Sequence, residues 1–234
     1  MEKMKTKIFE CALIFVGIKH CGKSTQGKRI ASHLGLEFFD TDDLIQKYEG
    51  ISPREIYTKF GKEKFMEAEK NACQKLAEFF ETQNQKYEIE NCAEVDSVET
   101  VCRASENSEQ NAQCGLCKKN AFVAATGGGI CENKNAIEIL KTFGTIIFLQ
   151  TNEKTAADRI VREADFSTTP ARNLPAYIAE KNPRTEKETR EIFHDFFMRR
   201  TNRYKKIADV IVQMENASKE INTEKILAAL GMKC

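Results

Sequence analysis

The stretch that decides the fold reads ALIFVGIKHCGKS and spans residues 12–24. Its first five residues form a continuous apolar run, which is typical of a buried parallel strand. The remainder matches the pattern G-x-x-x-x-G-K-[ST], with Gly17, Gly22, Lys23 and Ser24 at the fixed positions. Glycines let the backbone curl so that successive N–H groups point at phosphate oxygens, and the following helix adds its positive N-terminal end. We therefore predict a phosphate-binding loop between a strand and a helix.

The side chains of this loop indicate which ligands it holds. In such loops the lysine reaches the β- and γ-phosphates of a nucleotide, and the hydroxyl that follows it ligates Mg²⁺. The sequence thus predicts that Lys23 and Ser24 bind ATP and Mg²⁺, together with Gly17, Gly22 and Thr25. The alternative is an ordinary glycine-rich turn, but the strand–loop–helix context favours the phosphate loop.

Strand and helix patterns alternate along most of the chain. Short apolar runs predict further strands at residues 36–40, 122–126, 145–149 and 210–213. Helical periodicity predicts helices at residues 24–34, 41–49, 62–80, 135–142, 153–163, 185–208 and 223–230, with another opening at Pro53. Gly35 and Gly50 follow two of these helices, as C-terminal caps do. The alternation predicts an α/β fold with a parallel sheet.

Residues 81–119 interrupt this pattern. They include eight acidic and four basic residues, no Phe, and four of the nine cysteines. We predict an inserted acidic, Cys-rich loop in a single domain that spans residues 1–234. Cys114 and Cys117 form a C-x-x-C pair, and Cys92 and Cys102 would complete four thiolates for zinc. Because Cys92 and Cys102 are ten residues apart, only half of the usual paired pattern is present. The composition favours a loop without function, and a zinc site and a redox pair are the two alternatives.

The composition excludes several classes of protein. The chain has 36 Lys and Arg against 35 Asp and Glu, which argues against a nucleic-acid or membrane-surface binder. It holds no apolar run of about 18 residues, so we expect no transmembrane helix. The basic segment Met1–Lys7 is followed by an apolar stretch that runs into the glycine loop. We interpret this stretch as the first strand and not as part of a signal peptide. An odd number of cysteines without such a signal indicates free thiols in the cytoplasm, and we expect a monomer.

Two further motifs lie where the second and third predicted strands end. Asp40 and Asp42 follow one strand, and Gly127, Gly128 and Gly129 follow the next. The carboxyl ends of parallel strands line the ligand crevice, so one carboxylate can face a metal and the other an acceptor hydroxyl. The alternative is an N-capping Asp with an acidic first turn. Three consecutive glycines permit a ligand to approach the backbone closely.

The order of five segments resembles the shikimate kinase family: GIKHCGKST, FFDTDDLI, GKEKF, ATGGG and RRTNRYKKIAD. The resemblance covers the chain except residues 81–119. It implies a P-loop kinase of the nucleoside-monophosphate-kinase type, with a five-stranded parallel sheet flanked by helices and a mobile lid at about residues 160–185. It also implies phosphorylation of a ring hydroxyl of shikimate by ATP and Mg²⁺, which gives shikimate 3-phosphate.

The resemblance implies a role for individual residues. Asp40 matches the carboxylate that binds Mg²⁺ through water, and Asp42 matches the carboxylate that holds the acceptor hydroxyls and acts as base. Residues 127–129 match the glycine motif on the acceptor side. Arg159 matches an arginine beside the adenine, and Arg200 matches the arginine that pairs with the acceptor carboxylate.

One departure concerns that acceptor carboxylate. Met66 stands where the family has a second arginine that grips it. A buried bidentate arginine contact contributes a few kcal/mol, which Met cannot supply. Arg200 then acts alone, a cation such as Lys62 or Arg54 substitutes, or the acceptor differs.

The second departure is the lid. The family's lid reads Arg-Pro-Leu-Leu, whereas residues 172–175 here read RNLP in a longer segment. We expect Arg172 to reach over the transferred phosphate, with Arg184 as second choice and a solvated loop residue as the alternative for each. The departures leave two alternative functions open: a kinase for another small hydroxy acid such as gluconate, and a catalytically inactive regulatory protein that binds ATP.

Overall fold

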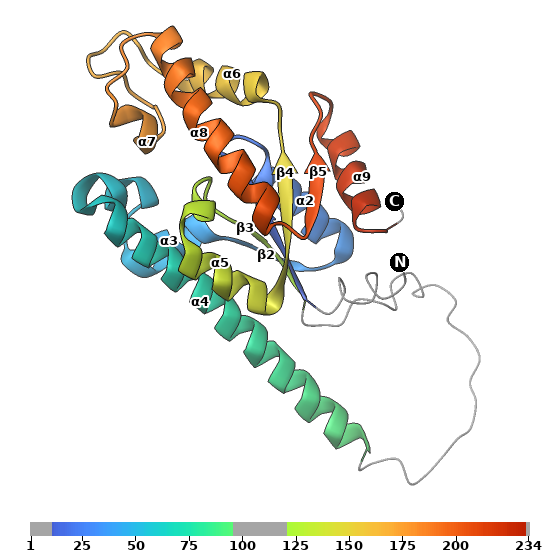
Figure 1. Cartoon of the computed structure of the whole chain (residues 1–234). Coiled ribbons are helices and arrows are strands. Elements are labelled where there is room, and N and C mark those ends of the chain that lie inside the picture. Colours follow the sequence, from blue (N-terminus) through green and yellow to red (C-terminus); the bar gives the residue numbers. More distant parts are fainter. Residues whose placement is uncertain (1–10, 96–120, 233–234) are drawn as a thin grey trace.

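A five-stranded parallel sheet forms the centre of the computed structural model (Figure 1). The structure describes residues 11–95 and 121–232, and of residues 86–95 it describes the backbone alone. Neighbouring strands follow the order β2-β3-β1-β4-β5, with the bounds β1 Ala12–Val16, β2 Glu37–Asp40, β3 Phe122–Ala125, β4 Gly144–Gln150 and β5 Val210–Gln213. The sheet confirms the predicted fold class.

The position of β1 determines which loops meet. Phe15 is in register with Ala125 of β3 on one side and with Ile147 of β4 on the other. Asp40, the last residue of β2, is in register with Ala125 as well. Because all these strands are parallel, the chain leaves β1, β2 and β3 at the same edge of the sheet.

Helices cover both faces of the sheet. The helices are α2 Lys23–Leu34, α3 Thr41–Glu49, α4 Pro53–Val95, α5 Lys134–Phe143, α6 Glu153–Glu163, α7 Ala176–Ala179, α8 Glu186–Ile207 and α9 Lys219–Ala229, with a 3₁₀ turn η1 at Ile130–Glu132. In Figure 1, α2 and α9 lie behind the sheet and α4, α5 and α8 lie in front of it. Over the described ranges 11–95 and 121–232, no helix is long and apolar enough to cross a membrane.

An aromatic cluster anchors α4 to the sheet. Phe122 of β3 is completely buried, and its ring centroid lies 5.2 Å from Phe39 of β2 and 5.7 Å from Phe79 of α4. Phe80 of α4 and Phe143 of α5 complete the group, and their ring centroids lie 6.3 and 6.0 Å from that of Phe122. Most of these rings meet edge to face, an arrangement that adds about 0.5–1.5 kcal/mol per pair beyond burial. The cluster fixes the base of α4, whose N-terminal half borders the cavity described below.

Helix ends agree with the glycine signals in the sequence. Gly35 and Gly50 take positive φ values of 66° and 74° directly after α2 and α3. Their backbone N–H groups donate to Ala31 and Gln46, which caps each helix. Both predicted C-terminal caps are confirmed.

The largest difference from the sequence analysis concerns α4. We predicted an inserted loop from residue 81, but the helix continues through Val95. Glu, Gln and Lys make up seven of the fifteen residues 81–95, and adding such residues to an existing helix needs no new nucleation. The helix is interrupted instead at Gly61, where φ is 84°. The turn η1 and the short helix α7 were not predicted, and α9 begins at Lys219 rather than at residue 223.

Close packing of α2 on the sheet yields a first prediction. A Cβ atom on Gly27 would lie 2.5 Å from the Phe38 ring and 3.3 Å from the Phe15 ring. Gly27→Val should therefore lower the free energy of unfolding by about 1–3 kcal/mol, the usual cost of overpacking. Urea titration monitored by circular dichroism measures this value. Lys28→Val, at the exposed neighbouring position, should cost less than about 1 kcal/mol, and equal costs would contradict the packing argument.

Candidate active site

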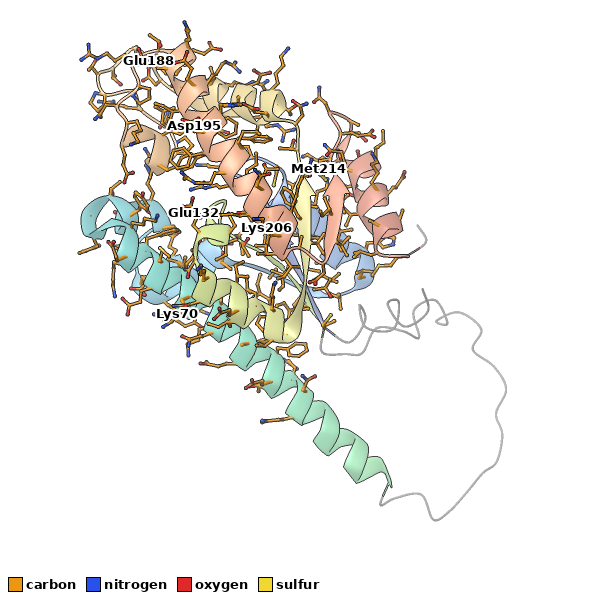
Figure 2. The ribbon with its side chains drawn as sticks, in the orientation of Figure 1. Lys70, Glu132, Glu188, Asp195, Lys206 and Met214 are labelled. Atoms are coloured by element: carbon orange, nitrogen blue, oxygen red, sulfur yellow. The ribbon has the colours of Figure 1, made fainter. Side chains whose placement is uncertain are left out.

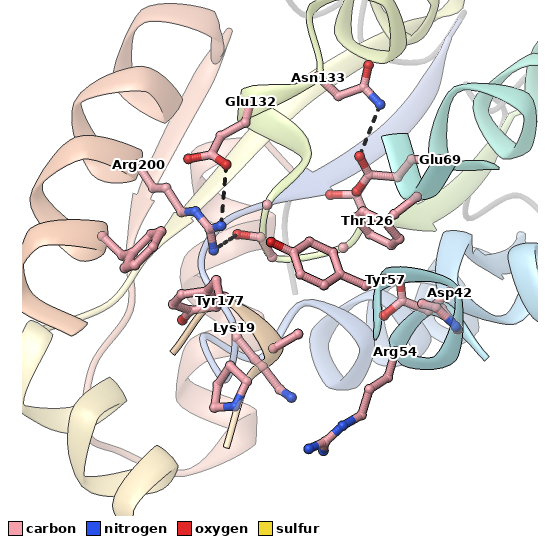
Figure 3. Close-up of a pocket in the computed structure, with 18 of the residues that line it drawn as sticks. Lys19, Asp42, Arg54, Tyr57, Glu69, Thr126, Glu132, Asn133, Tyr177 and Arg200 are labelled. Atoms are coloured by element: carbon pink, nitrogen blue, oxygen red, sulfur yellow. Dashed lines mark hydrogen bonds and ion pairs between the residues drawn. The ribbon is translucent and has the colours of Figure 1, made fainter. Parts of the chain in front are cut away.

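A cavity of about 660 Å³ opens at the edge of the sheet where β1, β2 and β3 end (Figure 3). The phosphate loop and the start of α3 line one part of it, and the triple glycine and α8 line another. The first turns of α4 and the segment 174–181 complete the wall. The structure thus brings three of the predicted motifs into one cavity.

The phosphate loop carries its lysine against the loop backbone. Lys23 Nζ donates to the carbonyl oxygens of Gly17 and Ile18 at 3.0 and 2.9 Å. These bonds satisfy an ammonium group whose residue is only 8% exposed. Gly22 takes a φ of 97°, which a side chain would strain, so the loop requires glycine directly before α2. The loop therefore presents backbone N–H groups and a buried cation at a helix N-terminus, the arrangement that binds phosphate.

Helix α6 supports this loop from outside. Arg159 Nη1 donates to the carbonyl oxygen of His20, and Glu163 Oε2 lies 3.5 Å from His20 Nε2. His20 itself has a φ of 65°, an uncommon conformation for a residue other than glycine. Arg159, predicted to lie beside the adenine, therefore contacts the phosphate loop and does not line the cavity.

Asp40 and Asp42 have different surroundings. Asp40 accepts a hydrogen bond from Ser24 Oγ at 2.6 Å and caps α3 by accepting from the backbone N–H of Asp42 at 3.0 Å. The Asp42 side chain is exposed at the cavity, where partial desolvation by the surrounding protein, with the nearby Asp40 charge, raises its pKa. The N-cap alternative thus applies to Asp40, while Asp42 is left to face a ligand.

Each residue of the triple glycine allows a different close approach. A Cβ atom on Gly128 would lie 2.7 Å from the backbone nitrogen of Lys19, so the phosphate loop and the triple glycine touch backbone to backbone. A Cβ on Gly129 would lie 3.3 Å from Arg200 Nη2. Gly127 donates its N–H to Thr41 Oγ1 at 3.2 Å. The glycines hold the phosphate loop, α3 and α8 together around the cavity.

Arg200 is held firmly at the end of the cavity next to α8. Its guanidinium lies over the ring of Tyr177 at 4.3 Å and near that of Phe196 at 5.2 Å. Nη1 donates to the carbonyl oxygen of Gly128 at 3.3 Å, and Nη2 lies 3.5 Å from Glu132 Oε2 (Figure 3). Two aromatic faces, one carbonyl and one carboxylate therefore fix a cation that is almost fully buried.

The sequence analysis missed a buried carboxyl group in the cavity wall. Glu69 is 1% exposed, and its burial, opposed by a hydrogen bond from Asn133, raises its pKa to about 7. Among the described residues, its Oε1 atom has no hydrogen-bond partner. Glu69 follows Met66 by three positions, so helical spacing alone could have placed it on the same face of α4.

The sequence motifs assigned no role to several other cavity residues. Lys19 of the phosphate loop is partly buried, and this burial lowers its pKa. The pKa of Tyr57 is raised to about 12 by burial and by a hydrogen bond with Glu180. Glu132 follows the triple glycine and lies between α4 and α8 (Figure 2). Their positions depend on contacts between distant segments, which the sequence does not reveal.

The predicted lid segment is packed over the cavity, but its arginines point elsewhere. Leu174 and Ile178 are completely buried, and Tyr177 contacts Arg200 as described. Arg172 is exposed and forms an antiparallel bridge with Asp165 at the base of the segment. Neither Arg172 nor the exposed Arg184 lines the cavity. The backbone bridge explains this placement, because it fixes Arg172 at the base of the loop.

The residues named for the acceptor carboxylate all border the cavity. Met66, Lys62 and Arg54 line it together with Arg200. The side chain of Asn133 donates to the carbonyl oxygen of Met66 at 2.8 Å, which ties α4 to the triple-glycine loop.

The cysteine predictions fall mostly outside this site. The side chains of Cys92, Cys102, Cys114 and Cys117 lie outside the described residues. Cys21 is a buried free thiol within the phosphate loop. Within the described part of the chain, no group of three or more His, Cys, Asp or Glu side chains is arranged to hold a metal ion.

Sequence comparison places these features in a family. The model of the family described as shikimate kinase matches residues 19–82 and 103–231. The shikimate kinase of Colwellia psychrerythraea is 25% identical over 218 residues, which cover 93% of this chain and 95% of that protein. The shikimate kinase of Caldanaerobacter subterraneus is 28% identical over 184 residues, which cover 79% and 81%.

Solved structures share the fold. The shikimate kinase of Acinetobacter baumannii, solved in complex with shikimate, aligns with a TM-score of 0.62 at 22% identity and covers 95% of this chain and 94% of that one. The shikimate kinase of Bacteroides thetaiotaomicron aligns with a TM-score of 0.64 at 18% identity and covers 95% and 99%. With a family model that matches most of its length and a cavity built from that family's motifs, this chain belongs to the shikimate kinase family.

Proposed function

We propose that this chain transfers the γ-phosphoryl group of ATP to a hydroxyl group of shikimate, which gives shikimate 3-phosphate and ADP. ATP is the phosphate donor of the family. One observation carries the proposal: a single cavity is lined by the phosphate loop, by Asp42 and by the triple glycine with Arg200. The two substrates can therefore meet in this cavity next to the carboxylate of Asp42.

The phosphate loop supplies the donor side. Its backbone N–H groups and the N-terminus of α2 bind the phosphates, and Lys23 stabilises the charge that develops on the transferred group. Phosphoryl transfer needs little covalent chemistry from the protein, because positioning and charge stabilisation provide most of the acceleration. Lys19 adds a second positive charge beside Lys23 and Asp42.

The acceptor side positions the hydroxyl and the carboxylate. Asp42 orients the acceptor hydroxyl and takes its proton, and its raised pKa suits a group that must accept one. Arg200 binds the carboxylate of shikimate, and Gly127, Gly128 and Gly129 let the sugar-like ring lie against the backbone. Arg159 holds the phosphate loop through His20 and so remains on the nucleotide side.

Mg²⁺ fits the residues near the loop. The hydroxyl of Ser24 and the carboxylate of Asp40 lie 2.6 Å apart, and both offer the oxygen ligands that this ion prefers. Mg²⁺ in kinases usually keeps several waters and phosphate oxygens, so two protein ligands suffice. When bound, Mg²⁺ neutralises charge on the phosphates.

The domain organisation follows from the same proposal. A single kinase domain carries an insertion at residues 81–119 and a lid at about 160–185. The match to the family model leaves out residues 83–102, which fall within this insertion, and includes residues 103–119. Arg172 or Arg184 reaches the transferred phosphate only if this lid rearranges, since neither lines the cavity. As part of this proposal the enzyme is a monomer of a reducing cytoplasm, with a small molecule as its partner.

The function is tested by following the phosphorylated product. Purified protein with ATP and Mg²⁺ is incubated with shikimate or with gluconate, and the products are identified by mass spectrometry. We expect shikimate phosphate, with little product from gluconate. Phosphorylation of gluconate but not of shikimate would establish the alternative acceptor suggested by Met66. ATP binding without either phosphorylated product would establish the regulatory alternative.

Removal of the loop lysine should abolish this activity. Lys23→Ala deletes the cation that stabilises the transferred group, so kcat/KM for ATP should fall by at least about a hundredfold in a coupled ADP assay. Lys28→Ala alters an exposed residue of the same helix and should retain wild-type turnover. Comparable activity of Lys23→Ala and Lys28→Ala would contradict the role of the loop.

The two adjacent carboxylates of α3 provide a matched pair for the base. Asp42→Asn keeps the size of the side chain but removes the proton acceptor, so kcat should fall by about 10²–10⁴ with little change in KM for ATP. Asp43→Asn, at an exposed position outside the cavity wall, should stay within about twofold of wild type. Steady-state kinetics with both substrates measure these values, and an active Asp42→Asn variant would exclude Asp42 as the base.

A further inference from the structure

Four cations surround one carboxylate between α4 and α8. Glu132 Oε1 lies 3.0 Å from Arg199 Nη2 and 3.8 Å from Arg203 Nη1. Glu132 Oε2 lies 3.5 Å from Arg200 Nη2 and 3.9 Å from Lys62 Nζ. We call these four basic side chains the cationic corner.

The cationic corner carries more positive charge than Glu132 can balance. Burial alone would raise the pKa of Glu132, but Arg200 and Arg199 hold it below its usual value, so the carboxylate is ionised. One negative charge then faces four positive ones. Glu132 and Arg200 are only 12% and 8% exposed at the side chain, whereas Lys62, Arg199 and Arg203 are 54%, 47% and 47% exposed. The buried pair interacts strongly, and the surplus positive charge around it favours binding of a further anion.

Two of the four cations converge on the same atom. Arg200 and Lys62 both lie within ion-pair distance of Glu132 Oε2, and both line the cavity. Their positive groups, from α8 and α4, are therefore close enough to share one carboxylate group. Arg54, the other cation considered for this role, lies apart from Arg200 in Figure 3, and its charge acts on Lys19, whose pKa it helps to lower.

Helix geometry relates Lys62 to the missing arginine. Lys62 and Met66 are four residues apart and both follow the interruption of α4 at Gly61, so they occupy the same face of one regular helical segment. Both line the cavity. A cation at position 62 can therefore reach the region that a side chain at position 66 reaches.

We propose that Lys62 is a specificity-determining residue that binds the carboxylate of the acceptor together with Arg200, and that it replaces the cation absent at Met66. Glu132 keeps the two cations together at the cavity wall. This inference rests on the proposed function, because it assumes an acceptor that carries a carboxylate. It chooses Lys62 over Arg54 and over Arg200 alone, which the sequence left as open alternatives.

The test compares shikimate with its methyl ester, which keeps the ring and hydroxyls but lacks the negative charge. Isothermal titration calorimetry measures both ligands on wild type and on Lys62→Met, which keeps most of the side chain. We expect Lys62→Met to weaken shikimate binding about tenfold, as loss of one partly exposed charge-assisted hydrogen bond does. Binding of the methyl ester should change less than about twofold.

Lys64→Met is the control, because Lys64 lies on the same helical segment, pairs with Glu67 and does not line the cavity. It should bind both ligands as wild type does. Equal shikimate binding by Lys62→Met and wild type, or equal weakening of both ligands by Lys62→Met, would overturn the proposal. Wild type that binds shikimate but transfers no phosphate would instead overturn the proposed function, and the binding comparison would still decide the role of Lys62.

Discussion

The site depends on the contact between two loops that leave neighbouring strands. Thr126 continues the β1–β3 ladder by donating its N–H to the carbonyl oxygen of Phe15 at 3.1 Å. Two residues later, Gly128 lies so close to Lys19 that no Cβ atom fits between them. The phosphate loop and the triple-glycine loop are thereby fixed against each other. Under the proposed function, any larger side chain at Gly128 would separate the donor from the acceptor, and phosphoryl transfer is sensitive to such displacements.

Charges of both signs line the cavity. Lys19 and Lys23 come from the phosphate loop, Asp42 from the start of α3, and Arg200 with Glu132 from the wall next to α8 (Figure 3). A molecule that carries both a hydroxyl group and a carboxylate on its ring matches a cavity with a carboxylate and a separate cation. Because Lys23, Arg200 and Glu132 are largely buried, their interactions are stronger than they would be in bulk solvent. The arrangement explains how one cavity serves a polyanionic donor and an anionic acceptor.

Local sequence patterns predicted the parts of the site that depend on backbone conformation. The phosphate loop, the Asp40 cap and the triple glycine each require particular residues at fixed spacing, and each lies where the strand pattern predicted. Glu69 and Glu132 could not be found in this way, because their roles arise from helices that meet only in the folded chain. The prediction for Arg172 relied on a loose motif match, and pairing of the loop backbone holds that residue outside the cavity wall. The end of α4 was misjudged because a polar composition suits an exposed helix as well as a loop.

Because donor and acceptor share one cavity, the rate of ATP cleavage should depend on whether shikimate is bound. The rate of ADP formation by the wild-type protein, measured with Mg²⁺ and ATP in the presence and absence of shikimate, tests it in a single experiment. The account predicts slow ADP formation with ATP alone and a large increase, matched by phosphorylated acceptor, when shikimate is added. An ADP formation rate that does not respond to shikimate would contradict it.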